Sequence, residues 1–296
     1  MPIPESQLET WSHQGSVTQS SATYATVKGV LEKSDAPYAG RSHTSFLQGS
    51  YGNDTNIFAD SDVDVVMRLD SVFYHDLSKL ADEEQQAFKS NFSDASYSHA
   101  DFKKDVTAQL SKAFSDAVKP GNKAIFVAEN GSRRDADVLV AAQYRKYHSF
   151  KSMADQNYIE GICFWNADGI QISNYPKLHS TNCTTKHQQT SQWFKPAVRI
   201  LKNMRNNMIG DERIKDGLAP SYFLEGMLYN VPNSNFGTSY QDTMVNCINW
   251  LLKTDRSKLV CANEQFYLLH PTALETWRAE KCDEFLNAVA QYWKSW

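Results

Sequence analysis

Two aspartates stand two residues apart in the segment Asp62-Val-Asp-Val-Val-Met67, which alternates and then runs apolar as a β-strand does. Alternate residues of a strand point to the same face, so Asp62 and Asp64 should present neighbouring carboxylates while Val63 and Val65 face the core. Two carboxylates on one face repel each other unless a cation neutralises them, and carboxylate oxygens suit Mg²⁺. The pair therefore predicts a divalent metal site.

A third carboxylate is available further along the chain. In the segment Arg133-Arg-Asp-Ala-Asp137-Val-Leu-Val, Asp137 directly precedes an apolar run typical of a strand. Asp137 is the candidate, and Asp135, which would share its strand face, is the rival. Three carboxylates can hold two metal ions about 3.5–4 Å apart, one lowering the pKa of an attacking hydroxyl and the other stabilising a leaving pyrophosphate. We expect two such ions, Mg²⁺ or Mn²⁺.

A turn upstream of the carboxylate pair offers a phosphate site. Gly49 and Ser50 follow the short apolar segment Ser45–Gln48. Glycine lets the backbone approach a phosphate closely, and a serine at a turn adds a hydroxyl beside exposed backbone N–H groups. A Gly-Ser pair or an Asp-x-Asp pair alone is usually a loop or a turn. The combination, with a third aspartate on a later strand, predicts a nucleotidyltransferase that acts on nucleoside triphosphates.

Hydrophobic periodicity predicts which elements position these residues. Residues 6–34 indicate one long helix, or two with a break near Gly15. From residue 178 onward the pattern is nearly all helical. We expect a mixed α/β lobe over residues 1–177 and a helical lobe over 178–296, with a cleft between them. The remaining expectations are helices over 82–90 and 102–118, a loop over 55–60, strands over 124–128 and 136–141, a hairpin turning at Asn166–Gly169, and helix breaks at 210–220, 231–237 and 270–271.

The bulk composition excludes several other classes of protein. The chain has 296 residues, 41% of them hydrophobic, and a net charge of −4, so it lacks the basic excess of a duplex-binding protein. No apolar run approaches the roughly 20 residues of a membrane helix, and the first residues do not resemble a signal peptide. We therefore expect a cytoplasmic protein. The five cysteines, none at C-x-x-C spacing, are expected to be reduced core thiols.

The Gly-Ser turn, the D-x-D-V strand and the later aspartate together resemble the polymerase-β nucleotidyltransferase superfamily. Eight segments narrow this resemblance to clade E of the bacterial cGAS/DncV-like nucleotidyltransferases (CD-NTases): PESQLETWSHQG, FLQGSYGNDTNI, DSDVDVVMRLDSVF, YRKYHS, YIEGICFW, ISNYPKLH, FKPAVRILKNMR and LAPSYFLEGMLYNVP. The resemblance covers essentially the whole chain. It implies a polymerase-β-like lobe with a mixed sheet and a C-terminal helical lobe, with the active site in the cleft.

The resemblance also implies roles for single residues. Asp62, Asp64 and Asp137 would be metal ligands, and Asp137 would also activate the attacking hydroxyl. The nucleotide-binding set would comprise Gln48, Gly49 and Ser50 around the donor triphosphate, Lys202 and Ser221 on phosphates, and Tyr222 stacked on a base.

Asn174, in ISNYPKLH, matches the asparagine that reads the base edge in pyrimidine-using members. An amide has one acceptor and two donors, and uracil shows an N3–H donor flanked by carbonyl acceptors. On its own, an asparagine before Tyr-Pro is most often a turn residue.

The implied activity is a cyclic dinucleotide synthase that joins UTP and ATP, with cyclic UMP-AMP as the expected product and CBASS anti-phage defence as the context. It would act as a monomer without template nucleic acid or membrane, and its product would bind an effector protein. The alternatives are a cyclic purine or oligonucleotide product, a transferase that modifies a protein or an antibiotic, and a non-catalytic nucleotide sensor. A modifying transferase would need an acceptor pocket that the sequence does not indicate. The intact carboxylate set argues against a non-catalytic sensor.

The double substitution Asp62→Asn with Asp64→Asn should abolish nucleotide transfer and leave the fold intact, because it removes the charge that would hold the metal ions. In metal-free buffer the melting temperature should stay the same or rise, since two like charges are removed. Product formation from labelled NTPs measures the loss of nucleotide transfer, and thermal denaturation measures whether the fold is kept. Retained synthesis by the double variant would contradict a metal-dependent mechanism.

Overall fold

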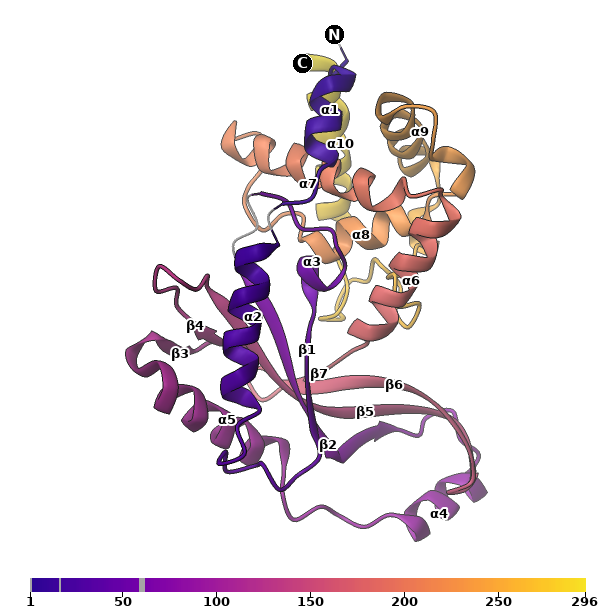
Figure 1. The fold of residues 1–296 in the computed structure, drawn as a ribbon. Helices are drawn as coiled ribbons and strands as arrows, with labels where there is room; N and C mark the ends of the chain where they lie inside the picture. Colours follow the sequence, from indigo (N-terminus) through magenta and orange to yellow (C-terminus); the bar gives the residue numbers. More distant parts are fainter. Residues whose placement is uncertain (1, 16, 59–61) are drawn as a thin grey trace. The chain divides into compact units, whose positions relative to one another are not determined.

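The structure is a computed structural model that describes residues 2–15, 17–58 and 62–296. It divides into two compact units, which are described separately below (Figure 1). The helical unit comprises Met1–Ser16, Gly49–Asp60 and Lys177–Trp296, and the sheet unit comprises Val17–Gln48 and Ser61–Pro176.

The sheet unit is built on a seven-stranded mixed sheet, as predicted. Its strand order is β1-β2-β5-β4-β3, and β6 pairs with both β5 and β7. β2 runs parallel to β5, and the other described pairs are antiparallel. The elements are α2 (Thr18–Leu31), β1 (His43–Leu47), β2 (Val63–Asp76), α4 (Asp82–Asn91), α5 (His99–Phe114), a 3-10 turn (Ser115–Ala117), β3 (Val118–Pro120), β4 (Ile125–Val127), β5 (Ala136–Ser152), β6 (Asp155–Trp165) and β7 (Gln171–Asn174).

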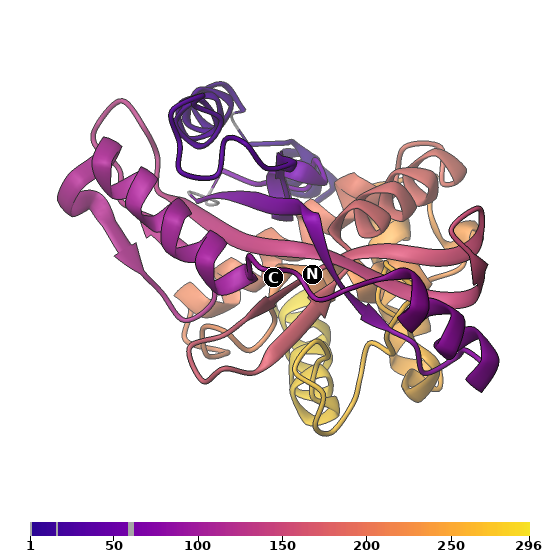
Figure 2. The same cartoon turned by 90° about the horizontal axis from the view of Figure 1, so that it is seen from below.

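The alternation in β2 separates its two faces as expected. Val63 and Val65 are fully buried, whereas Asp64 is half-buried. β5 is longer than its predicted range of 136–141, because its second half pairs with β6. At the far end of this β5–β6 ribbon, α4 packs Phe88 against Tyr147 and Phe150 (Figures 1 and 2).

The predicted hairpin is confirmed between β6 and β7. Its turn is closed by the Asn166 backbone, which donates to the Ile170 carbonyl at 3.1 Å, and Gly169 adopts a positive φ of 76°. Gly161 lies in β6 of the same hairpin, next to Tyr175. A Cβ at Gly161 would stand 2.6 Å from the backbone oxygen of Asn174 and 2.7 Å from the Tyr175 ring. The close approach of β7 to β6 therefore depends on a glycine at this position.

The helical unit packs its helices around a large apolar core, which includes Leu8, Leu201, Leu224 and Phe285. Among the described residues, no helix is long and apolar enough to span a membrane. The elements are α1 (Glu5–Ser12), α3 (Gly49–Gly52), α6 (Pro176–Gln189), α7 (Phe194–Gly210), α8 (Ser221–Asn230), 3-10 turns (Asn233–Asn235 and Arg256–Lys258), α9 (Tyr240–Lys253) and α10 (Ala279–Ser295).

The division into units differs from the predicted consecutive lobes 1–177 and 178–296. Of the one long helix or two helices expected over residues 6–34, the structure has two, with the break near Gly15. The first, α1, belongs to the helical unit, because its Leu8 is buried in that unit's core. The inserted segment Gly49–Asp60 also belongs to the helical unit. The predicted 55–60 loop is irregular from Thr55 to Phe58, and its last two residues lie outside the described ones.

Two other predicted ranges need correction. The helix expected over 102–118 ends at Phe114, and Val118–Pro120 pairs with β4 instead. Residues 254–278 are mostly not helical, since Val260 bridges Tyr267 and Leu269 bridges Trp277. All five cysteines are free and buried, as expected.

Replacing Gly161 by alanine should destabilise the sheet unit by about 1–3 kcal/mol, because the new methyl group would overlap the β7 backbone and the Tyr175 ring. The matched control is Gly29→Ala in α2, where, apart from neighbouring residues of the helix itself, no described atom lies within 4 Å of the new Cβ. This control should stabilise the helix by about 0.5–1 kcal/mol. Urea denaturation of both variants measures the difference, and equal stabilities would contradict the close packing at Gly161.

Candidate active site

The structure brings the predicted carboxylates together at the start of two neighbouring strands. Asp64 of β2 and Asp137 of β5 are register partners in the parallel pair, and both are half-buried. Partners in a parallel pair share a face of the sheet, and Asp62, exposed just before β2, lies two residues from Asp64. Burial, and after it the negative charges of Asp62 and Asp135, raise the pKa of Asp137 above its usual value.

Asp135, the rival third ligand, is engaged by the local backbone. Its carboxylate accepts the Glu129 backbone N–H at 2.7 Å, and its carbonyl accepts the Val63 N–H at 3.0 Å. Asp137 instead lies inside the strand, in register with Asp64. Neighbouring carboxylates, two of them half-buried, suit a hard divalent cation, which would relieve their repulsion. The residues present therefore fit the predicted metal centre, with Asp137 favoured as the third ligand.

The predicted phosphate turn follows β1 directly. Gln48, the last residue of the sheet unit before the turn, donates its backbone N–H to the Asp64 carbonyl at 3.0 Å. Gly49 has a φ of 62°, a left-handed conformation that glycine adopts without strain. Gly49 and Ser50 begin the short helix α3, and both are half-buried. The sharp turn expected at this position is thus present.

Three predicted nucleotide-binding residues lie on α7 and α8 of the helical unit. Lys202 is fully buried, and its ammonium donates to the Thr55 carbonyl at 3.0 Å. Ser221, at the start of α8, accepts a hydrogen bond from Arg205 at 3.0 Å. The Tyr222 ring stacks on His179, with centroids 4.9 Å apart and planes 24° apart. The positive charge of Lys202 therefore lies against the backbone of the segment that follows Ser50.

Asn174 is the last residue of β7 and is half-buried. Its side-chain oxygen accepts the backbone N–H of the next residue, Tyr175, at 2.8 Å, so the side chain is engaged locally at the end of the strand. A carbonyl oxygen has two lone pairs and the amide carries two N–H donors, so this bond is compatible with a second role in reading a base.

Comparisons with known proteins decide the family. A family model described as the cGAS/DncV-like nucleotidyltransferase C-terminal helical domain matches residues 181–294. The cyclic UMP-AMP synthase of Rhodothermus marinus is 42% identical over 298 residues, which cover the whole chain and 99% of that protein. The chain belongs to the cGAS/DncV-like nucleotidyltransferases. Lys202, Ser221 and Tyr222 fall within the matched helical domain of this family.

Other CD-NTases match over most of their length but carry different product names. The cyclic dipurine nucleotide synthase of Elizabethkingia meningoseptica is 34% identical over 84% of each chain. A cyclic dipyrimidine nucleotide synthase of Legionella pneumophila is 31% identical over 97% of each chain. The solved structure of the Rhodothermus enzyme with Apcpp and Upnpp has a TM-score of 0.90 and covers the whole chain and 98% of that protein. The family, the fold class and the nucleotidyltransferase activity predicted from the sequence are confirmed.

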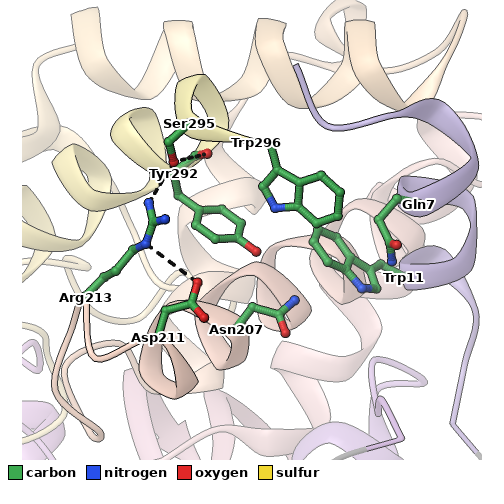
Figure 3. Close-up of a pocket in the computed structure, with 8 residues that line it drawn as sticks. All are labelled: Gln7, Trp11, Asn207, Asp211, Arg213, Tyr292, Ser295 and Trp296. Carbon is green, nitrogen blue, oxygen red and sulfur yellow. Dashed lines mark hydrogen bonds and ion pairs between the residues drawn. The ribbon is translucent and has the colours of Figure 1, made fainter. Parts of the chain in front are cut away.

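A pocket of about 500 Å³ lies elsewhere in the helical unit, between α1, the end of α7 with the residues that follow it, and the end of α10 (Figure 3). Inside it, Arg213 donates to Ser295 at 2.7 Å, and Trp11 meets Trp296 edge to face. Its eight lining residues, none of which was predicted as a site residue, are Gln7, Trp11, Asn207, Asp211, Arg213, Tyr292, Ser295 and Trp296. The pocket is therefore separate from the predicted nucleotide-binding residues.

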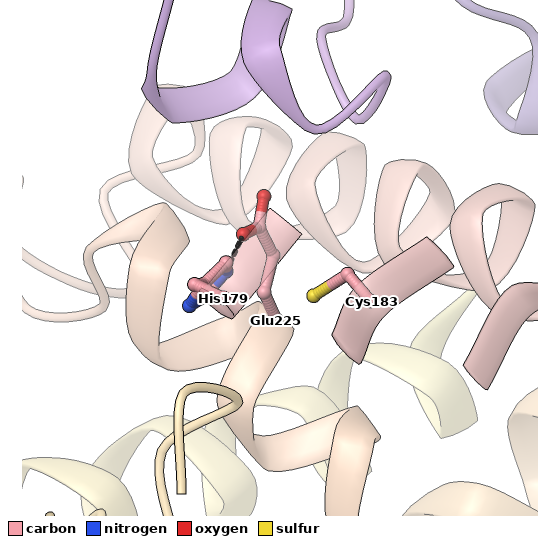
Figure 4. A group of neighbouring side chains, drawn as sticks. All are labelled: His179, Cys183 and Glu225. Carbon is pink, nitrogen blue, oxygen red and sulfur yellow. Dashed lines mark hydrogen bonds and ion pairs between the residues drawn. The ribbon is translucent and has the colours of Figure 1, made fainter. Parts of the chain in front are cut away.

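Sequence reasoning missed a buried polar group beside the phosphate turn. Glu225 of α8 and His179 of α6 lie 2.6 Å apart, with Cys183 close by, and each is 2% exposed or less (Figure 4). One signal for it was present in the sequence: Glu225 is the single charged residue in the apolar stretch Phe-Leu-Glu-Gly-Met-Leu. A lone charge on a buried helix face implies a specific polar partner.

Asp137→Asn should raise the melting temperature in chelator at neutral pH. The raised pKa of Asp137 means that the folded state favours the protonated carboxyl over the carboxylate. The wild-type protein is therefore most stable with respect to this group at low pH, and it loses that stability as pH rises through the folded-state pKa. The increase in melting temperature of Asp137→Asn over the wild type should therefore shrink towards about pH 4, where Asp137 also becomes protonated in the unfolded state. Thermal denaturation across pH in EDTA measures the gain, with exposed Asp116→Asn as the control. A gain independent of pH would contradict this charge assignment.

Proposed function

We propose that the chain is a cyclic dinucleotide synthase that joins UTP and ATP into cyclic UMP-AMP and releases two pyrophosphates. The observation that carries the proposal is the register pairing of Asp64 with Asp137, next to Asp62, on one face of the sheet. The 42% identity to the Rhodothermus cyclic UMP-AMP synthase supports the choice of product.

The three carboxylates would hold two divalent ions, Mg²⁺ or Mn²⁺. When bound, these ions would lower the pKa of the attacking ribose hydroxyl and stabilise the leaving pyrophosphate. Asp137 accepts the proton of that hydroxyl, whose oxygen bonds the α-phosphorus as the bond from that phosphorus to the bridging β-phosphate oxygen breaks. The linear product then rebinds, so that the hydroxyl of its second nucleoside attacks the remaining triphosphate and closes the ring.

The turn and the helices would bind the nucleotides. Gln48, Gly49 and Ser50 would line the donor triphosphate, where the backbone N–H groups of the turn favour an anion. Lys202 would add positive charge behind the turn, and Ser221 would contact a phosphate. Because His179 occupies one face of the Tyr222 ring, a base would stack on the other face.

We further propose that the enzyme works in the bacterial cytoplasm as part of a CBASS anti-phage system. It would act as a monomer, and the net charge of −4 argues against a template nucleic acid. The cyclic product would be bound by an effector protein.

Incubating the purified protein with radiolabelled NTPs and Mg²⁺ or Mn²⁺ tests the proposal. Phosphatase-resistant small products that contain uridine and adenosine by mass spectrometry are the expected result. Products with purines alone would reassign the bases, label on protein or on an added antibiotic would favour a modifying transferase, and no turnover would favour a sensor.

Asn174→Ser should loosen base choice towards purines. An unpaired buried polar group costs about 1–3 kcal/mol, which corresponds to roughly ten- to hundredfold in discrimination. The smaller serine also leaves room for a larger ring. A competition among the four NTPs, followed by nuclease mapping of the product, measures the change.

Asn174→Asp is the sharper companion variant. Aspartate keeps the oxygen that accepts the Tyr175 N–H but has no amide donors. If Asn174 only closes the turn, the aspartate variant should select bases as the wild type does. If Asn174 reads uracil, both variants should lose uridine preference while total turnover persists.

A further inference from the structure

The phosphate turn is closed by two buried polar residues that follow it. The Asn53 N–H donates to the Gly49 carbonyl at 3.1 Å, and the Thr55 N–H donates to the Ser50 carbonyl at 2.9 Å. Asn53 is 6% exposed and Thr55 is fully buried. Neither side chain faces solvent, so any effect of Thr55 on a nucleotide has to pass through the backbone of the turn.

Both side chains are held by one carboxylate of α8. Glu225 accepts a hydrogen bond from the Asn53 amide at 2.9 Å, one from the Thr55 hydroxyl, and one from His179 at 2.6 Å. Burial alone would raise the pKa of Glu225, but the hydrogen bond and charge of His179, with the Thr55 hydroxyl and Lys202, lower it below the usual value. Glu225 is therefore a buried anion whose donors come from the turn and from α6.

The same network continues to the proposed base-stacking residue. His179 donates to Glu225 through its ring edge and lies against the ring of Tyr222 with its face. A continuous set of contacts thus joins Gly49 and Ser50, through Asn53, Thr55, Glu225 and His179, to Tyr222. All of these residues belong to the helical unit, so this connection lies within one compact body.

A structural zinc ion is the other chemistry that His179, Cys183 and Glu225 could support, since their ligand atoms lie within 4.8 Å of one another. The 2.6 Å separation of His179 and Glu225 is a hydrogen bond, shorter than two ligands of a tetrahedral zinc allow. A zinc-bound histidine usually donates its second ring N–H, whereas the His179 Nδ1 has no hydrogen-bond partner among the described residues. Protein donors already satisfy the Glu225 carboxylate, so its geometry favours a hydrogen-bonded anchor.

We infer that Glu225 and His179 are positioning residues that fix the triphosphate turn Gly49–Ser50 relative to the Tyr222 ring, and so set the affinity for the nucleotide that uses both. This inference rests on the proposed nucleotide-binding roles of the turn and of Tyr222. Glu225 would act through the turn and need not touch the nucleotide itself.

The Thr55 hydroxyl offers the cleanest test, because it is fully buried and bonds Glu225 alone among the described contacts of that hydroxyl. Thr55→Val keeps the shape and the backbone carbonyl but removes the donor, whereas Thr55→Ser keeps the donor. We expect Thr55→Val to raise KM for the NTPs about tenfold, equivalent to about 1.4 kcal/mol, with a smaller change in kcat. Thr55→Ser should restore a KM near that of the wild type.

Calorimetry with non-hydrolysable UTP and ATP analogues and Mg²⁺ gives a second readout that needs no turnover. Thr55→Val and Glu225→Gln should both bind more weakly, while Leu251→Ala, a buried change in α9, should lower stability without weakening binding to the folded protein. Wild-type affinity in a folded Thr55→Val protein, or stoichiometric zinc lost on chelation together with the fold, would overturn the inference. If the wild type binds the analogues in a Thr55-dependent way but makes no cyclic product, the proposed function fails and the inference stands.

Discussion

The parallel, in-register pairing of β2 with β5 is the constraint on which the proposed catalytic centre depends. A slip of one residue would turn the fully buried Val63 and Val65 towards the other face, so burial of these valines fixes the register. The same register places Asp64 opposite Asp137. The sheet therefore holds the carboxylates together despite their repulsion. Burial, and after it the charges of Asp62 and Asp135, raises the pKa of Asp137, and divalent cations would offset this cost of ionisation.

The second constraint is that the phosphate turn belongs to a different unit from the strands that flank it in sequence. β1 ends in the sheet unit, the chain then enters the helical unit at Gly49, and β2 lies again in the sheet unit. Within the helical unit the segment is held on several sides: Lys195 pairs with Asp54 at 2.9 Å, Ser180 donates to the Gly52 carbonyl, and Lys202 donates to the Thr55 carbonyl. The position of the turn is thus set by helices distant in sequence.

These two constraints differ in how far the sequence alone could predict them. The alternation around Asp62 and Asp64 is local, so the strand and its carboxylate face could be predicted, and the Gly-Ser turn likewise. The second half of β5 could not be predicted from the sequence, because its polar and aromatic residues form a strand only by pairing with β6 and packing against α4. Asn53 and Thr55 are ordinary loop residues until Glu225, some 170 positions away, is brought to them by folding. The roles proposed for Lys202, Ser221 and Tyr222 came from family resemblance, since helical periodicity alone would make them core or surface residues.

The base-reading role proposed for Asn174 would give a physical reason why named products differ among relatives with the same fold. Among the described strands, β7 pairs with β6 alone, and Asn174 is its final residue. A side chain at the end of an edge strand can change without disturbing the β2–β5 register that holds the carboxylates. Relatives between 31% and 42% identical carry dipyrimidine, dipurine and UMP-AMP product names, so base choice varies where the overall sequence match persists. With the roles proposed for Asn174 and the carboxylates, the chemistry of transfer and the choice of base would rest on parts of the sheet with unequal structural constraint, and substitution would alter selectivity at lower cost to stability.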